Sequence, residues 1–173
     1  MSPKSPLDPI LEAYLTTKDS LKITQRVLAG DMEQLLARTQ FIGEPLDTSN
    51  ALISKSREQT ADLAIIALWA VFERHVIEFV REKLQPLKRT PPPALPHRLY
   101  EKVHSGIERW KSADILDLLK GDIDANLLGL AKKIKKYRDW IAHRNPKSSA
   151  EKTDPISAHT ILSQIMNLLE DLS

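Results

Sequence analysis

One stretch decides the fold of this chain, and it reads Ala61-Asp62-Leu63-Ala64-Ile65-Ile66-Ala67-Leu68-Trp69-Ala70-Val71-Phe72. All of these residues except Asp62 are apolar. A run that is apolar on almost every side is typical of a helix surrounded by other helices. The helical pattern extends over about residues 52–84 and becomes amphipathic beyond Glu73. The sequence therefore predicts a long central helix in this region.

One further helical region precedes the central helix in the sequence, and another follows it. One covers about residues 7–40, where Gly30 marks a bend or a division, and residues 43–50 form a loop. After the central helix, Pro86 and Thr90-Pro91-Pro92-Pro93 interrupt the chain. The next helical region covers about residues 97–120, as one helix or as two with Ser112-Ala113-Asp114 capping the second.

Two more helices complete the expected set. One begins at Ile123 or Asp124 and runs to about His143, and Asn145-Pro146 stops it. The last begins at Thr153-Asp154-Pro155, a capping residue followed by a proline, and reaches about Leu172. We therefore expect an all-α fold, a compact bundle of about five helices. It forms a single domain over residues 7–173, after a flexible N-terminus at residues 1–6.

The composition limits the kinds of protein that this chain can be. Its 173 residues are 42% apolar and 28% charged, which provides enough apolar mass for one core. The absence of cysteine excludes disulfides, thiolate metal sites and a cysteine nucleophile. The first residues carry no apolar signal core, and the most apolar run is too short to cross a bilayer. We expect a soluble, cytoplasmic protein with no membrane contact.

The positive charge is concentrated in one part of the chain. The net charge is only +2. Within one short stretch, however, seven basic residues face a single acid, Asp139; they are Lys132, Lys133, Lys135, Lys136, Arg138, Arg144 and Lys147. A local basic patch is typical of a surface that binds nucleic acid. A solvated helix face has the same composition, so the charge alone leaves both interpretations open.

The same helix carries the residues with the best-defined chemistry, in Arg138-Asp139-Trp140-Ile141-Ala142-His143. Asp139 and His143 are four residues apart and share a helix face, so the carboxylate could orient the imidazole for proton transfer. Arg138 lies about 140° from His143 around the helix, a separation that a long side chain can bridge. Alternatively, Asp139 pairs with Lys135, Arg144 caps carbonyl groups, and His143 complements the helix dipole.

This motif resembles that of the HEPN superfamily, and of its toxin-type members in particular. These small helical bundles carry an arginine followed, after four to six residues, by a histidine, often with a polar residue next to the arginine. Arg138, Asp139 and His143 match this pattern late in the chain, and Asn145-Pro146 follows as in many members. The helix that ends Ala70-Val71-Phe72-Glu73-Arg74 also resembles the second helix of the family. The resemblance makes Glu73 a candidate partner for the motif.

The resemblance implies an endoribonuclease that needs no metal and no cofactor. In the reaction, the RNA 2′-hydroxyl attacks the phosphate, which requires a base, an acid and positive charge at the phosphoryl oxygens. Arg138, Asp139 and His143 are the catalytic candidates, and a homodimer would supply two of each. Lys132, Lys133, Lys135, Lys136 and Arg144 would bind the RNA backbone. The resemblance also implies a role in a toxin–antitoxin or phage-defence system and a possible antitoxin partner.

One departure and two alternatives accompany this interpretation. Some HEPN toxins carry a tyrosine two residues after the histidine, where an antitoxin modifies it, whereas this chain has Asn145 there. One alternative function is that of a noncatalytic HEPN domain that binds RNA, a nucleotide or a protein. The other is that of a helical interaction module in which Arg138, Asp139 and His143 form a structural ion-pair cluster. The remaining histidines stand in no pattern of metal ligands.

Overall fold

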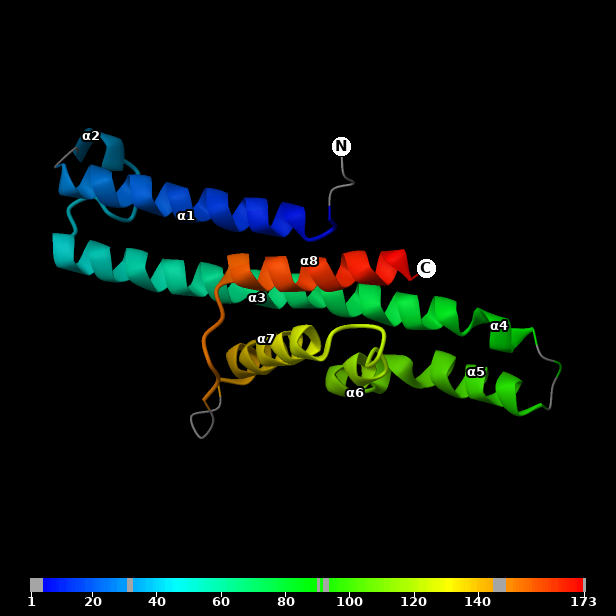
Figure 1. The fold of residues 1–173 in the computed structure, drawn as a ribbon. Helices are drawn as coiled ribbons and strands as arrows, with labels where there is room; N and C mark the ends of the chain where they lie inside the picture. Colours follow the sequence, from blue (N-terminus) through cyan, green and yellow to red (C-terminus); the bar gives the residue numbers. More distant parts are fainter. Residues whose placement is uncertain (1–4, 31–32, 90, 92–93, 145–148, 173) are drawn as a thin grey trace.

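The computed structural model describes residues 5–30, 33–89, 91, 94–144 and 149–172. Within these residues the chain forms α-helices and one short 3-10 helix, and no strand (Figure 1). The all-α prediction is therefore confirmed. Five helices are seven residues or longer, namely α1 (Asp8–Ala29), α3 (Leu46–Lys83), α5 (Leu95–Gly106), α7 (Ala125–His143) and α8 (Pro155–Asp171). The short ones are α2 (Glu33–Leu36), α4 (Gln85–Lys88), α6 (Ser112–Asp117) and the 3-10 helix Ile107–Arg109.

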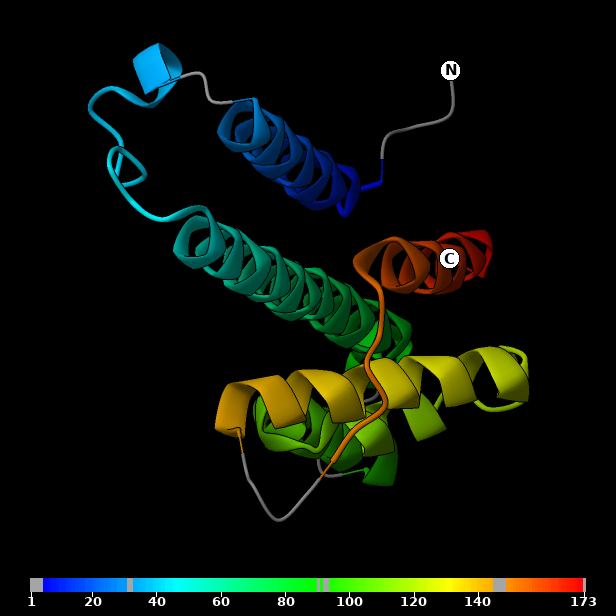
Figure 2. The same cartoon turned by 90° about the vertical axis from the view of Figure 1, so that its left-hand side faces the viewer.

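Helix α3 is the central element, as its apolar sequence predicts. It contacts α1, α4, α6, α7 and α8. In Figure 1, α1 lies along the first half of α3 in the opposite direction, and α8 lies along its middle in the same direction. Figure 2 shows α7 crossing α3 on the side away from α1. The side chains of Leu68, Trp69 and Phe72 are therefore almost completely buried.

Helices α7 and α8 pack their apolar faces onto α3. The buried residues of α7 recur at helical spacing, and those of α8 do the same; they are Leu127, Leu128, Ala131, Ile134, Tyr137 and Ile141 in α7, and Ala158, Leu162, Ile165, Met166 and Leu169 in α8. Full burial of one large apolar side chain contributes about 1.5–3 kcal/mol. This packing fixes one side of α7 against the core and leaves the other side exposed for its polar residues.

The ends of α7 and α8 follow the sequence closely. Asp124 caps α7 by accepting the backbone N–H groups of Asn126 and Leu127, and Asp154 caps α8 in the same way. Helix α7 ends at His143, because Arg144 adopts a left-handed conformation with φ 45° and ψ 37°. Its backbone N–H still donates to the carbonyl of Trp140, at 2.7 Å. Asn145 and Pro146, the predicted stop, lie outside the described residues.

The first helical region divides at Gly30, as the sequence allows, so α1 ends at Ala29 and a separate single turn, α2, follows. The predictions for residues 43–50 and for Ser112 were wrong in detail. The predicted loop at residues 43–50 is too long, because α3 already begins at Leu46, directly after Pro45. The region 97–120 divides into α5 and α6, but Lys111 precedes α6 and Ser112 is not its cap. The Ser112 hydroxyl donates instead to Glu73 of α3.

In the part of the chain that the structure describes, none of the helices combines the length and the hydropathy that a membrane span requires.

Candidate functional site

The exposed side of α7 borders an open groove of about 520 Å³. Most of its lining comes from α7, and the rest comes from Ala113 of α6 and from Ser149 and Ala150; the α7 residues are Lys132, Lys135, Lys136, Asp139, Trp140 and His143. Their spacing of three and four residues places them on one face of the helix. The groove therefore collects three of the predicted RNA-binding lysines with two of the three catalytic candidates.

Arg138 belongs to a chain of ion pairs beside the groove rather than to its lining. Its Nη1 lies 3.1 Å from Oδ1 of Asp139, and its Nη2 lies 3.7 Å from Oε2 of Glu73. The structure thus brings Glu73 of α3 to Arg138 of α7, the pair that the resemblance implies. The Arg138 side chain is 28% exposed, so its guanidinium remains accessible to solvent.

Asp139 is engaged by cations on both of its oxygens. Oδ1 accepts from Arg138, and Oδ2 accepts from Lys135 Nζ at 2.5 Å. The sequence allowed Asp139 to pair with Lys135 or with His143, and in the structure it pairs with Lys135. Among the described residues, neither carboxylate oxygen of Asp139 contacts His143. Asp139 consequently acts as a bridge between two cations rather than as the direct support of the imidazole.

His143 lies in the last turn of α7 and is exposed to solvent. Its imidazole makes no hydrogen bond or ion pair with any of the described residues, and it lines the open groove. Both ring nitrogens are thus available to a ligand or to water within this part of the chain. An exposed histidine in this position has the access that a proton-transfer group requires.

The lysines of the basic stretch are less free than the sequence indicates. Lys132 Nζ lies 2.5 Å from Oδ1 of Asp117 in α6, and Lys133 Nζ lies 3.5 Å from Oε2 of Glu151. Hydrogen bonds from Lys120 and Lys132 lower the pKa of the Asp117 carboxyl below its ordinary value. Folding thus supplies acids that the local sequence lacks, and much of the predicted patch is neutralised.

Arg144 is not among the residues that line the groove, and its RNA-binding role has least support from the geometry. Its Nη2 lies 2.5 Å from Oδ2 of Asp62 in α3, and its guanidinium lies over the Trp140 ring, 5.1 Å from the centroid. The hydroxyl of Tyr137 donates to Oδ1 of the same carboxylate at 2.7 Å. Asp62 is only 6% exposed, so it ties the end of α7 to α3 from inside the molecule.

Sequence reasoning missed the roles of Asp62 and Tyr137, although a signal was present. Asp62 is the one charged residue in the apolar stretch 61–72. A charge that is buried in a helix bundle requires hydrogen-bond or ion-pair partners. Burial, followed by the hydrogen bond to Asp62, raises the pKa of the Tyr137 hydroxyl well above its ordinary value. Tyr137 therefore remains a neutral donor to the carboxylate at every ordinary pH.

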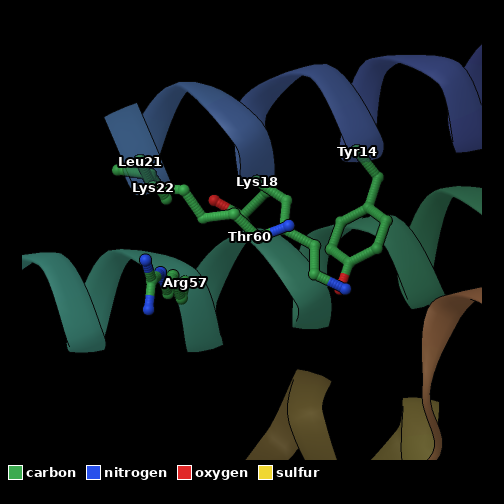
Figure 3. Close-up of a pocket in the computed structure, with 6 residues that line it drawn as sticks. All are labelled: Tyr14, Lys18, Leu21, Lys22, Arg57 and Thr60. Carbon is green, nitrogen blue, oxygen red and sulfur yellow. The ribbon is translucent and has the colours of Figure 1, made fainter. Parts of the chain in front are cut away.

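A second, smaller pocket of about 120 Å³ lies between α1 and α3 (Figure 3). Its cations already have neighbours: Lys18 lies over the Tyr14 ring, Lys22 pairs with Asp19, and Arg57 donates to Gln25. These contacts are those expected where two helices pack together. Among the described residues, no three histidine, aspartate or glutamate side chains gather closely enough to bind a metal ion.

Neither the protein-family models, nor the curated proteins, nor the solved structures give a match to this chain.

Proposed function

We propose that this chain is a metal-independent endoribonuclease of the HEPN type, and that the groove along α7 is its active site. The observation that carries the proposal is the exposed imidazole of His143, which lies in an open groove lined by three lysines. A polyanion such as RNA is attracted to a basic groove, and an accessible imidazole can transfer a proton at neutral pH. The proposal includes the wider role implied by the resemblance, in a cytoplasmic toxin–antitoxin or phage-defence system.

Each residue has a distinct task in the proposed reaction. His143 takes the proton from the RNA 2′-hydroxyl or gives one to the departing 5′-oxygen. The oxygen of the 2′-hydroxyl attacks the adjacent phosphorus, and the bond from phosphorus to the 5′-oxygen breaks. The products are a 2′,3′-cyclic phosphate and a 5′-hydroxyl. Arg138 stabilises the negative charge on the phosphoryl oxygens, and for this it exchanges its contacts with Glu73 and Asp139 for the phosphate.

A homodimer follows from the number of proton transfers. One imidazole cannot act as the base and as the acid in the same step, and among the described residues no second histidine lines the groove. Two copies of the chain that share one cleft would provide two His143 imidazoles and two Arg138 guanidinium groups. We therefore propose a two-fold dimer as the active form. An antitoxin protein would act by covering this cleft.

The pairing of Arg138 supports a second candidate, a noncatalytic domain that binds RNA, a nucleotide or a protein. Arg138 is within reach of two carboxylates, those of Asp139 and Glu73. A guanidinium held in this way links α7 to α3 and needs no substrate to account for its position. In this alternative the groove still binds an anionic ligand, but His143 transfers no proton.

The two candidates are separated by RNA cleavage in EDTA. The purified chain is incubated with single-stranded and hairpin RNA beside His143→Ala and, as a matched control, His104→Ala, which removes an exposed histidine of α5. The proposal expects cleavage by the parent and by the control, and loss of cleavage in His143→Ala. The same oligonucleotide with 2′-deoxyribose must remain intact. Binding without cleavage would establish the noncatalytic alternative, and equal cleavage by both variants would exclude His143.

A further inference from the structure

Lys136 differs from every other lysine that lines the groove. Lys132 is paired with Asp117, and Lys135 is paired with Asp139. Lys136 lines the same groove and is exposed, yet it makes no ion pair or hydrogen bond with a described residue. The groove therefore contains one lysine whose charge no carboxylate of the described chain offsets.

This difference decides which lysine binds a phosphate best. A paired lysine must first leave its carboxylate, and the carboxylate that remains nearby repels the incoming phosphate. Both effects reduce the affinity that Lys132 and Lys135 can contribute. Lys136 incurs neither cost, because its ammonium group faces solvent before the ligand arrives.

The position of Lys136 relative to His143 adds a second constraint. The two residues are seven apart in α7, which places them within about 20° of each other around the helix and about 10 Å apart along it. We take for the bound strand the axial spacing of one strand of a duplex, about 3.4 Å for each nucleotide. The separation along α7 therefore corresponds to about three nucleotides of one strand.

We infer that Lys136 is the principal RNA-backbone anchor of the groove, and that it binds a phosphate about three nucleotides away from the phosphodiester at His143. The inference rests on the proposed function for the identity of the ligand, an RNA strand. It goes further in assigning the binding to one of five predicted basic residues. Lys132, Lys133, Lys135 and Arg144 contribute less, because carboxylates already engage each of them.

The test measures binding apart from cleavage. The His143→Ala protein is titrated with a fluorescent 12-nucleotide RNA, uncleavable and 2′-O-methylated, over a range of salt concentrations, and the anisotropy is recorded. Lys136→Gln and Lys133→Gln are compared in this background. They remove the same charge from the same helix, but Lys133 is paired with Glu151 and lies outside the groove lining. Lys136→Arg retains the charge.

The expected results differ in size and in salt dependence. Lys136→Gln should weaken binding about fivefold, as loss of one exposed charge contact does. It should also reduce the slope of log K against log salt by about 0.7, the value for one phosphate contact to a single strand. Lys136→Arg should restore the parental slope, and Lys133→Gln should reduce the slope clearly less than Lys136→Gln does. Equal effects of the two glutamine variants, or no RNA binding by the parent, would overturn the inference.

This design distinguishes the inference from the proposed function. If the chain binds RNA through Lys136 but does not cleave it, the proposed ribonuclease activity is refuted and the anchoring role of Lys136 is supported. If the chain cleaves RNA through His143 but its RNA affinity does not change in Lys136→Gln, the proposed ribonuclease activity is supported and the anchoring role of Lys136 is refuted. A hairpin RNA in a parallel titration shows whether the anchored strand is single or paired.

Discussion

Replacing Asp62 with alanine should destabilise the whole chain by about 3 kcal/mol. The substitution removes the acceptor of the Tyr137 hydroxyl, and this tyrosine is almost completely buried. An unsatisfied buried donor costs about 1–3 kcal/mol. The ion pair with Arg144 adds at most about 1 kcal/mol, because the Arg144 side chain is 55% exposed.

Urea denaturation followed by far-UV circular dichroism measures this loss, and thermal unfolding gives a second value. For a chain of this size, a loss of about 3 kcal/mol lowers the Tm by roughly 6–12 °C. Glu58→Ala is the matched control, since it removes a carboxylate from α3 about one turn away, where the side chain is 68% exposed and pairs loosely with Lys152. The control should lose less than about 0.5 kcal/mol.

Asp62→Asn separates the two contributions. The amide oxygen still accepts from Tyr137, so this variant should lose only the charge interaction, about 1 kcal/mol or less. In a double-mutant cycle, Asp62→Ala and Tyr137→Phe should show a coupling of about 1–2 kcal/mol. If Asp62→Ala is no less stable than Glu58→Ala, the buried carboxylate does not tie α7 to α3, and the reasoning fails.

Three further predictions concern ionisation and capping. Because burial raises the pKa of Tyr137, its hydroxyl loses the proton at a lower pH in the unfolded chain than in the folded chain. The free energy of unfolding should therefore fall as the pH rises above about 10. Urea midpoints measured over this range should fall less in Tyr137→Phe than in the parent. Hydrogen bonds from Lys120 and Lys132 lower the pKa of Asp117, so its contribution to stability is lost only as the pH falls below the ordinary carboxyl range. An NMR titration should find this low pKa, and Lys132→Gln should raise it. Asp154→Ala removes the cap of α8 and should cost about 1 kcal/mol in urea, whereas Asp154→Asn should cost little.

The elements that could be predicted from the sequence are those whose signals are local. The apolar stretch 61–72 identifies the central helix, and the capping aspartates before α7 and α8 locate their first turns. Residues 30–50 could not be predicted as well. There α2 is only a single turn. The first residues of α3 are mostly polar and resemble a loop in the sequence, yet they are helical and Ser49 among them is buried.

The helical spacing of the motif indicates which of its residues share a helix face, and Asp139 and His143 both line the groove. The charges that surround these residues could not be predicted in the same way. The acids that neutralise the basic residues come from elsewhere in the chain, as with Asp117 and Glu151. Asp62 lies 82 residues before its partner Arg144. Pairings of this kind depend on how helices pack, and no local pattern in the sequence specifies them.

The contact between the first and last helices has a consequence for the order of folding. Asp8 of α1 lies 2.9 Å from His159 of α8, and α8 also contributes buried residues along α3. During synthesis α1 and α3 can meet early, because they are neighbours in the sequence. The face of α3 that α8 covers stays exposed until α8 has left the ribosome. Over that interval the nascent chain exposes apolar surface to which chaperones can bind.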